Sequence, residues 1–71
     1  MIYANFILLS DKGRKPLTRR VLITDINEFI ANRQAIQEGA ILRLCKSRGM
    51  TIRDLQTYGY NKIKFEIIKG E

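Results

Sequence analysis

Apolar and charged side chains alternate near the C-terminal end of the chain, over residues 62–68. Ile63, Phe65 and Ile67 occupy every second position, and charged residues stand between them. This period of two predicts a β-strand with one face toward the core and the other toward solvent. A single strand is not stable by itself in water, so other segments must pair with it. The alternation therefore commits the chain to a β-sheet.

Two further strands are predicted near the N-terminus. Residues 2–9 are rich in β-branched and aromatic side chains, and residues 18–24 resume a similar pattern. The segment between them, residues 10–17, contains Asp, Gly and Pro together with three basic residues, which is typical of an exposed turn. The first 24 residues are therefore expected to form a hairpin with a basic loop.

The middle of the chain carries two helix-start signals. Asp25 and Thr51 are each followed three residues later by an acidic residue. This spacing is typical of a capping box, in which the paired side chains satisfy backbone N–H groups that the helix leaves free. Apolar residues at helical spacing follow both positions, which predicts helices over about 25–38 and 51–58.

Gly39 decides how the region between these helices is divided. A glycine is a plausible C-terminal stop, which predicts a short separate helix over about 41–47. The apolar spacing continues past Gly39, so one longer helix reaching Ser47 is an alternative, with the glycine costing about 1 kcal/mol relative to alanine. A strand over 41–46 is a third interpretation.

We predict one α+β domain over residues 1–71. Its three-stranded antiparallel sheet, formed by about 2–9, 18–24 and 62–68, packs against two or three short helices. A chain of 71 residues buries only about 60% of the surface that its unfolded form exposes, so nearly every large apolar side chain must serve the core. Little of the chain is left for an elaborate active site.

The composition argues against catalysis and metal binding. The chain has no His and a single Cys, which removes the usual general base, the usual zinc ligand and any internal disulfide. Cys45 lies near Lys46 and Arg48, which would lower a thiol pKa, but it also falls on an apolar helical stripe, which favours a small buried core residue. The five glycines are scattered singly and form no phosphate-binding loop. We expect no enzyme, cofactor or metal.

Positive charge is the strongest functional signal, with 13 Lys and Arg against 7 Asp and Glu and a formal net charge of +6. The first basic group consists of Lys12, Arg14, Lys15, Arg19 and Arg20. The second consists of Arg43, Lys46, Arg48 and Arg53. If folding turns both groups the same way, the surface would favour nucleic acid through phosphate contacts. The alternative for the first group is a solvated hairpin tip that keeps the sheet edge from pairing.

Two segments have motif-like patterns, and each also has a plainer interpretation. Residues 42–59 have the order helix, glycine turn and capped helix, as in a helix-turn-helix, but a strand follows, so two small helices packed on a sheet are preferred. Tyr58 and Tyr60 flank Gly59 and precede lysines, an arrangement that can stack bases. Boundary residues between a helix and a strand are the more common role of such tyrosines.

Protein partners are the rival expectation. The same cations would suit a small inhibitor or adaptor, such as those encoded by mobile genetic elements, that docks on an acidic surface of a larger protein. Arg33 interrupts an apolar helical stripe and either snorkels from its edge or marks the rim of a partner surface. A homodimer through a strand edge or an apolar helix face fits both functions. The sequence has no signal-peptide pattern and no membrane-length apolar run, so the cytoplasm is the expected location, with no membrane partner.

Overall fold

Three strands and three helices make up the computed structural model, which describes residues 1–70. Their bounds are β1 Ile2–Ser10, β2 Leu17–Ile23, α1 Ile26–Ala31, α2 Arg33–Arg48, α3 Ile52–Thr57 and β3 Tyr60–Lys69. The strands form one antiparallel sheet in the order β2-β1-β3. This arrangement confirms the predicted α+β class, and each strand lies within two residues of its predicted bounds.

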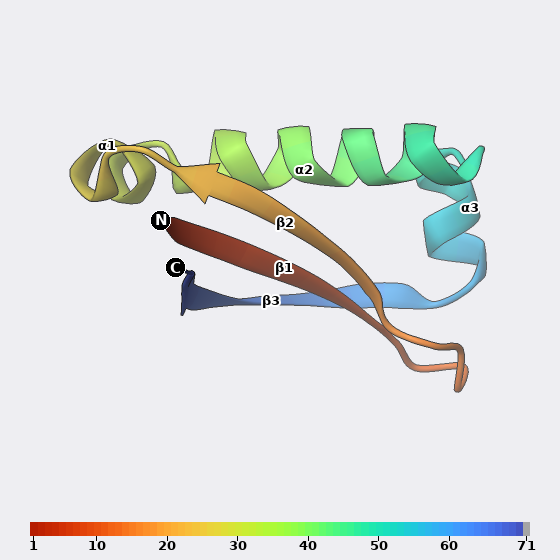
Figure 1. Ribbon diagram of the computed structural model, residues 1–71. Coiled ribbons are helices and arrows are strands. Elements are labelled where there is room, and N and C mark those ends of the chain that lie inside the picture. Colours follow the sequence, from red (N-terminus) through yellow and green to blue (C-terminus); the bar gives the residue numbers. More distant parts are fainter. Residues whose placement is uncertain (71) are drawn as a thin grey trace.

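The helices cover one face of the sheet. Figure 1 shows α2 running along the strands, with α1 near one end of the sheet and α3 near the other. On the covered face, Phe6 of β1 lies opposite Phe65 of β3 and Arg19 of β2. Within residues 1–70, no helix lies on the opposite face, so this part of the chain has two layers.

Side chains from all three helices meet the sheet in two apolar clusters. The first contains the buried residues Ala4, Phe6, Ile23, Phe29 and Ala40. The second contains Leu8, Leu17, Leu44, Cys45 and Leu55. Phe6, Phe29 and Phe65 pack with ring centres 5.8–6.5 Å apart, a favourable aromatic spacing. Two inward-facing residues of the strand predicted at 62–68, Ile63 and Phe65, pack against these clusters as predicted. The third, Ile67, is 44% exposed.

The predicted helix boundaries over 25–38 and 41–47 are wrong. The chain breaks at Asn32, whose backbone N–H makes the last helical bond to the carbonyl of Glu28. The Asn32 side-chain Nδ2 donates to the same carbonyl, a local side-chain bond of the kind that competes with helix continuation. The next helix then runs without interruption through Gly39 to Arg48. Burial of Ala40 and Leu44 against the sheet outweighs the intrinsic cost of one helical glycine, about 1 kcal/mol.

The starts of α1 and α3 follow the predicted caps, whereas α2 begins after Asn32 without a side-chain cap. The Asp25 carboxylate accepts hydrogen bonds from the N–H groups of Asn27 and Glu28. At α3, Thr51 Oγ1 accepts from the Asp54 N–H at 3.1 Å, and the Asp54 carboxylate accepts from the Thr51 N–H at 2.9 Å. In residues 1–70, no helix combines the length and the apolar character that crossing a membrane requires.

Candidate functional site

The loop between β1 and β2 packs against the junction of α3 and β3. Ser10 Oγ donates to the Tyr58 carbonyl at 2.7 Å, and the Asp11 N–H donates to the Gly59 carbonyl at 3.1 Å. Asn61 Nδ2 donates to the Asp11 carboxylate at 2.9 Å. These bonds join segments that are far apart in the sequence and hold the loop in a defined place.

Gly59 is essential to this close approach. Its φ of +80° lies in the left-handed region that side chains other than glycine rarely adopt. A Cβ at this position would also collide with the carboxylate of Asp11 and crowd the side chain of Lys12. The junction accepts the loop because residue 59 has no side chain.

The same contacts fix the basic residues of the loop. Lys12 Nζ donates to the Thr57 carbonyl at 3.0 Å, one of the carbonyls that the last turn of α3 leaves free. The Arg14 guanidinium lies over the Tyr58 ring, 3.9 Å from its centre. The Tyr60 hydroxyl donates to the Lys15 carbonyl at 2.7 Å. The loop cations are therefore positioned beside α3 and are not on a free hairpin tip.

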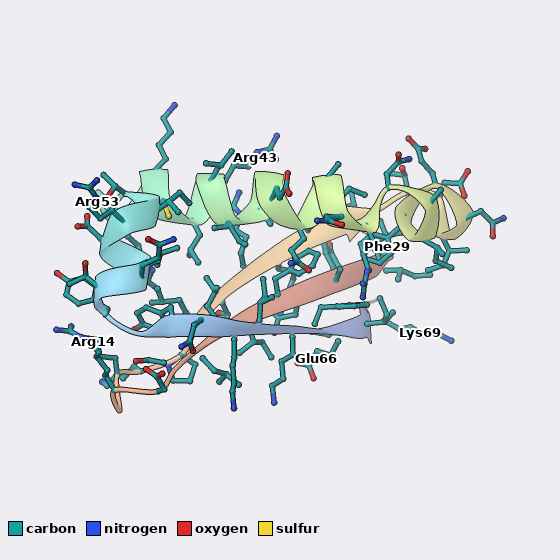
Figure 2. The ribbon with its side chains drawn as sticks, turned by 180° about the vertical axis from the view of Figure 1, so that it is seen from behind. Arg14, Phe29, Arg43, Arg53, Glu66 and Lys69 are labelled. Carbon is teal, nitrogen blue, oxygen red and sulfur yellow. The ribbon has the colours of Figure 1, made fainter. Side chains whose placement is uncertain are left out.

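Three residues of the second basic group, Lys46, Arg48 and Arg53, lie on segments that reach the same end of the molecule around the turn between α2 and α3. Gly49 ends α2 in the left-handed conformation, and the Met50 N–H donates to the Cys45 carbonyl at 2.9 Å. The chain then enters α3, which carries Arg53. Figure 2 shows Arg53 and Arg14 at one end of the molecule and Lys69 at the other.

We call this end of the molecule the cationic end. The segments that form it carry Lys12, Arg14, Lys15, Lys46, Arg48 and Arg53, and Figure 2 labels Arg14 and Arg53 among them. The segments that supply these six residues, 11–16 and 46–57, contain two acidic residues, Asp11 and Asp54. Both carboxylates bond to neighbouring parts of the fold, Asp11 to Asn61 and Asp54 to the Thr51 N–H. The cations in these segments therefore outnumber the acids three to one, which gives this end of the molecule an excess of positive charge.

The remaining three predicted site residues lie elsewhere. Arg19 lies on the helix-covered face of β2, and its buried Nε has no hydrogen-bond partner within residues 1–70. Arg20 is on the uncovered face, with its guanidinium 5.6 Å from the centre of the Tyr3 ring. Arg43 extends from the middle of α2, away from the sheet (Figure 2). Adjacent arginines in a strand point to opposite faces, so the structure separates Arg19 from Arg20.

An apolar groove of about 400 Å³ opens between α2, α3 and the start of β3. Its apolar lining comes from Leu8, Ile41, Leu42, Ile52, Leu55 and Tyr60. Leu42 is 58% exposed and Ile52 is 43% exposed. This groove was not predicted from the sequence. Both residues fall at helical spacings that resemble core positions, and only the packing of the helices shows that they face outward.

Cys45 is buried in the second apolar cluster. Burial raises the pKa of its thiol, and the carboxylate of Asp54 adds to the shift. The pKa is therefore not lowered by Lys46 and Arg48, the alternative considered from the sequence. The prediction that Cys45 is a small core residue is confirmed. Within residues 1–70, no cluster of His, Cys, Asp or Glu side chains is grouped so that it could hold a metal ion.

Comparison with known proteins gives no guide to function. No protein-family model, curated protein or solved structure significantly matches the chain. The geometry of the residues described above is therefore the basis for any functional proposal.

Proposed function

We propose that the protein is a non-enzymatic module that binds nucleic acid through contacts between its cationic end and phosphate groups. The observation that carries this proposal is the packing of the β1–β2 loop on the junction of α3 and β3. That packing brings the loop, with its three cations, against the end of α3, which carries Arg53 and follows the last turn of α2 with Lys46 and Arg48. Convergence of distant cations on one surface is the electrostatic footprint expected of a polyanion-binding protein.

The state of Arg14 supports phosphate binding in particular. Its guanidinium stacks on Tyr58 at 3.9 Å, which uses the face of the planar group. The N–H donors lie in the plane of the guanidinium, so stacking leaves them available for phosphate oxygens. Lysine and arginine contacts to phosphate carry little sequence information. The expected recognition is therefore weakly sequence-specific.

An acidic protein surface is the second candidate partner. The cationic end would then steer the association, as charged patches do at protein interfaces. The exposed Leu42 and Ile52 of the apolar groove favour this alternative, since they lie on the same helices as three of the cations. A cytoplasmic location suits both candidates and agrees with a free Cys45.

Fluorescence anisotropy with labelled duplex and single-stranded oligonucleotides, repeated at rising salt, tests the first proposal. Affinity should fall steeply with salt, with a logarithmic slope of about 0.9 per phosphate neutralised on duplex and about 0.7 on single strands. Arg53→Gln should weaken binding and reduce that slope by about one phosphate contact. Lys69→Gln removes the same charge at the opposite end of the molecule and is the matched control.

Three results would contradict the proposal. They are no binding at low salt, equal effects of the Arg53 and Lys69 substitutions, and an affinity that does not depend on salt. Capture of one defined acidic protein from nuclease-treated lysate, weakened by the Arg53 substitution and combined with no oligonucleotide binding, would establish the second candidate instead.

A further inference from the structure

β3 is an edge strand with ten residues. It pairs with β1 along one side, and no other strand among residues 1–70 pairs with its outer side. The backbone N–H and C=O groups on that side are therefore free to pair with another chain. Viewed from behind, β3 crosses in front of the other strands (Figure 2).

The helices cover β3 only partly. Ile63 and Phe65 are half-buried on the helix-facing side, and Ile67 is 44% exposed. The guanidinium of Arg33 lies over the Phe65 ring, 5.1 Å from its centre. This contact fits the snorkelling role considered for Arg33. The apolar row of Ile63, Phe65 and Ile67 along β3 is still not completely covered.

The charge pattern of β3 is self-complementary about Phe65. Reading outward in both directions, the neighbours are Lys64 and Glu66, of opposite charge, and then Ile63 and Ile67, both apolar. If two copies of β3 pair antiparallel with Phe65 opposite its own copy, each Lys64 lies opposite a Glu66, while Lys62 lies opposite Ile68. Directly opposite residues on one face of a sheet interact, and unlike charges there are stabilising.

We propose that the chain forms a homodimer by this pairing, with the two-fold axis at Phe65. Lys64 then lies opposite the partner subunit's Glu66, and the converse pair is equivalent by symmetry. Ile63 lies opposite the partner subunit's Ile67 on the helix-facing side. The two three-stranded sheets become one six-stranded sheet, and the incompletely covered apolar rows of the two copies adjoin.

The register centred on Phe65 places no like charges opposite each other, unlike the registers shifted from it by two residues. A shift of two residues in one direction puts Lys64 opposite the partner subunit's Lys64, although Lys62 then lies opposite the partner subunit's Glu66. A shift in the other direction puts Glu66 opposite the partner subunit's Glu66. Like charges directly opposite are destabilising. Parallel in-register pairing would align every charged residue with its own copy, so the antiparallel register centred on Phe65 is the complementary choice.

This interface leaves the cationic ends free. Tyr60, where β3 begins, lies five residues from Phe65, so the two copies of Tyr60 would be about 34 Å apart along the sheet at ~3.4 Å per residue. The cationic ends therefore lie at opposite ends of the dimer. The dimer does not depend on the proposed nucleic-acid binding, and either proposal can fail without the other.

Sedimentation velocity over a range of protein concentrations tests the dimer. The parent chain should show a reversible monomer–dimer equilibrium. Lys64→Glu and Glu66→Lys should each raise the dissociation constant about tenfold or more, because two attractive pairs become two repulsive ones. An equimolar mixture of the two variants should form a heterodimer as tight as the parent, since every opposite pair is again complementary.

Lys69→Glu is the matched control. It makes the same charge change on the same strand, but it lies opposite the partner subunit's Asn61, so the dissociation constant should stay within about twofold of the parent value. Circular dichroism checks that each variant is folded. A parent that stays monomeric at every concentration overturns the proposal, as do single variants that associate like the parent or a mixture that fails to restore association.

Cross-linking tests the register without introducing repulsive charge pairs. Lys64→Cys mixed with Glu66→Cys should give a disulfide-linked heterodimer under mild oxidation, because directly opposite strand residues lie within disulfide range. Lys69→Cys mixed with Lys64→Cys should not. Equal cross-linking of both mixtures would overturn the register. This test does not use Glu66→Lys, so it still applies if that variant unfolds through loss of the hydrogen bond between Glu66 and Asn5.

Discussion

The guanidinium of Arg14 lies over the ring of Tyr58, 3.9 Å from its centre. One residue belongs to the loop after the first strand, and the other ends the third helix. This stacking, together with the bond from Lys12 to the carbonyl of Thr57, gives the loop a fixed position on the junction of α3 and β3. The cationic end exists because these two contacts bring separate basic segments together.

Removing the aromatic ring from Tyr58 should therefore loosen the loop. Tyr58→Ala is expected to lower the free energy of unfolding by about 0.5–1 kcal/mol, the usual contribution of an exposed cation–π contact. Tyr58→Phe keeps the ring and should match the parent. Urea denaturation of the two variants measures this difference, and equal stability of Tyr58→Ala and the parent would show that the stacking contributes nothing in solution.

Replacement of Gly39 should stabilise the protein. Gly39 lies inside α2, and a Cβ there would meet no atom within 4 Å. Gly39→Ala should raise the free energy of unfolding by about 0.5–1 kcal/mol because alanine has the higher helix propensity. Gly49→Ala is the contrasting control and should destabilise, since φ at Gly49 is +65°. If the urea unfolding midpoints of Gly39→Ala and Gly49→Ala shift in the same direction, the different backbone roles assigned to these two glycines are contradicted.

Cys45 should make stability depend on alkaline pH. Burial raises the pKa of its thiol, so the folded chain favours the neutral form. The stabilising contribution is fully present below the ordinary thiol pKa of about 8.5 and is lost as pH rises through the higher pKa of the folded state. Unfolding free energies from pH 7 to 10.5 should therefore fall more steeply for the parent than for Cys45→Ala.

The reactivity of the Cys45 thiol is a second test of its burial. At pH 8, a disulfide reagent should modify Cys45 slowly in the folded chain and rapidly in concentrated urea, because the thiolate is the reactive form and the folded core excludes the reagent. Equal rates in the two conditions would mean that the thiol is exposed in solution.

The two aromatic residues that face each other across β1 and β3 should differ in their contribution to stability. Phe6 is 2% exposed, and Phe6→Ala should cost about 3–5 kcal/mol. Phe65 is half-buried, so Phe65→Ala should cost clearly less in the monomer. Both variants are to be compared by chemical denaturation at low protein concentration. An equal loss would show that Phe65 is as deeply buried as Phe6 in solution.

The strands and caps could be predicted because their signals are local. Alternation over residues 62–68 depends on successive side chains pointing to opposite faces, and the caps at Asp25 and Thr51 depend on residues within one helical turn. The position at which the helical region after Asp25 divides into separate helices could not be predicted in this way. The propensity of Gly39 suggested a stop, but the burial of Ala40 and Leu44 on the sheet decided otherwise.

The candidate site shows the same division between local and long-range information. The sequence alone determined the α+β class, the excess of cations and the two segments that carry them. Only the tertiary structure decided which cations meet, because Arg14 contacts Tyr58 while Arg19 and Arg20 point to opposite faces of one strand. The physical reason is that contacts between distant segments depend on how the loop packs on the α3–β3 junction, which no local pattern encodes.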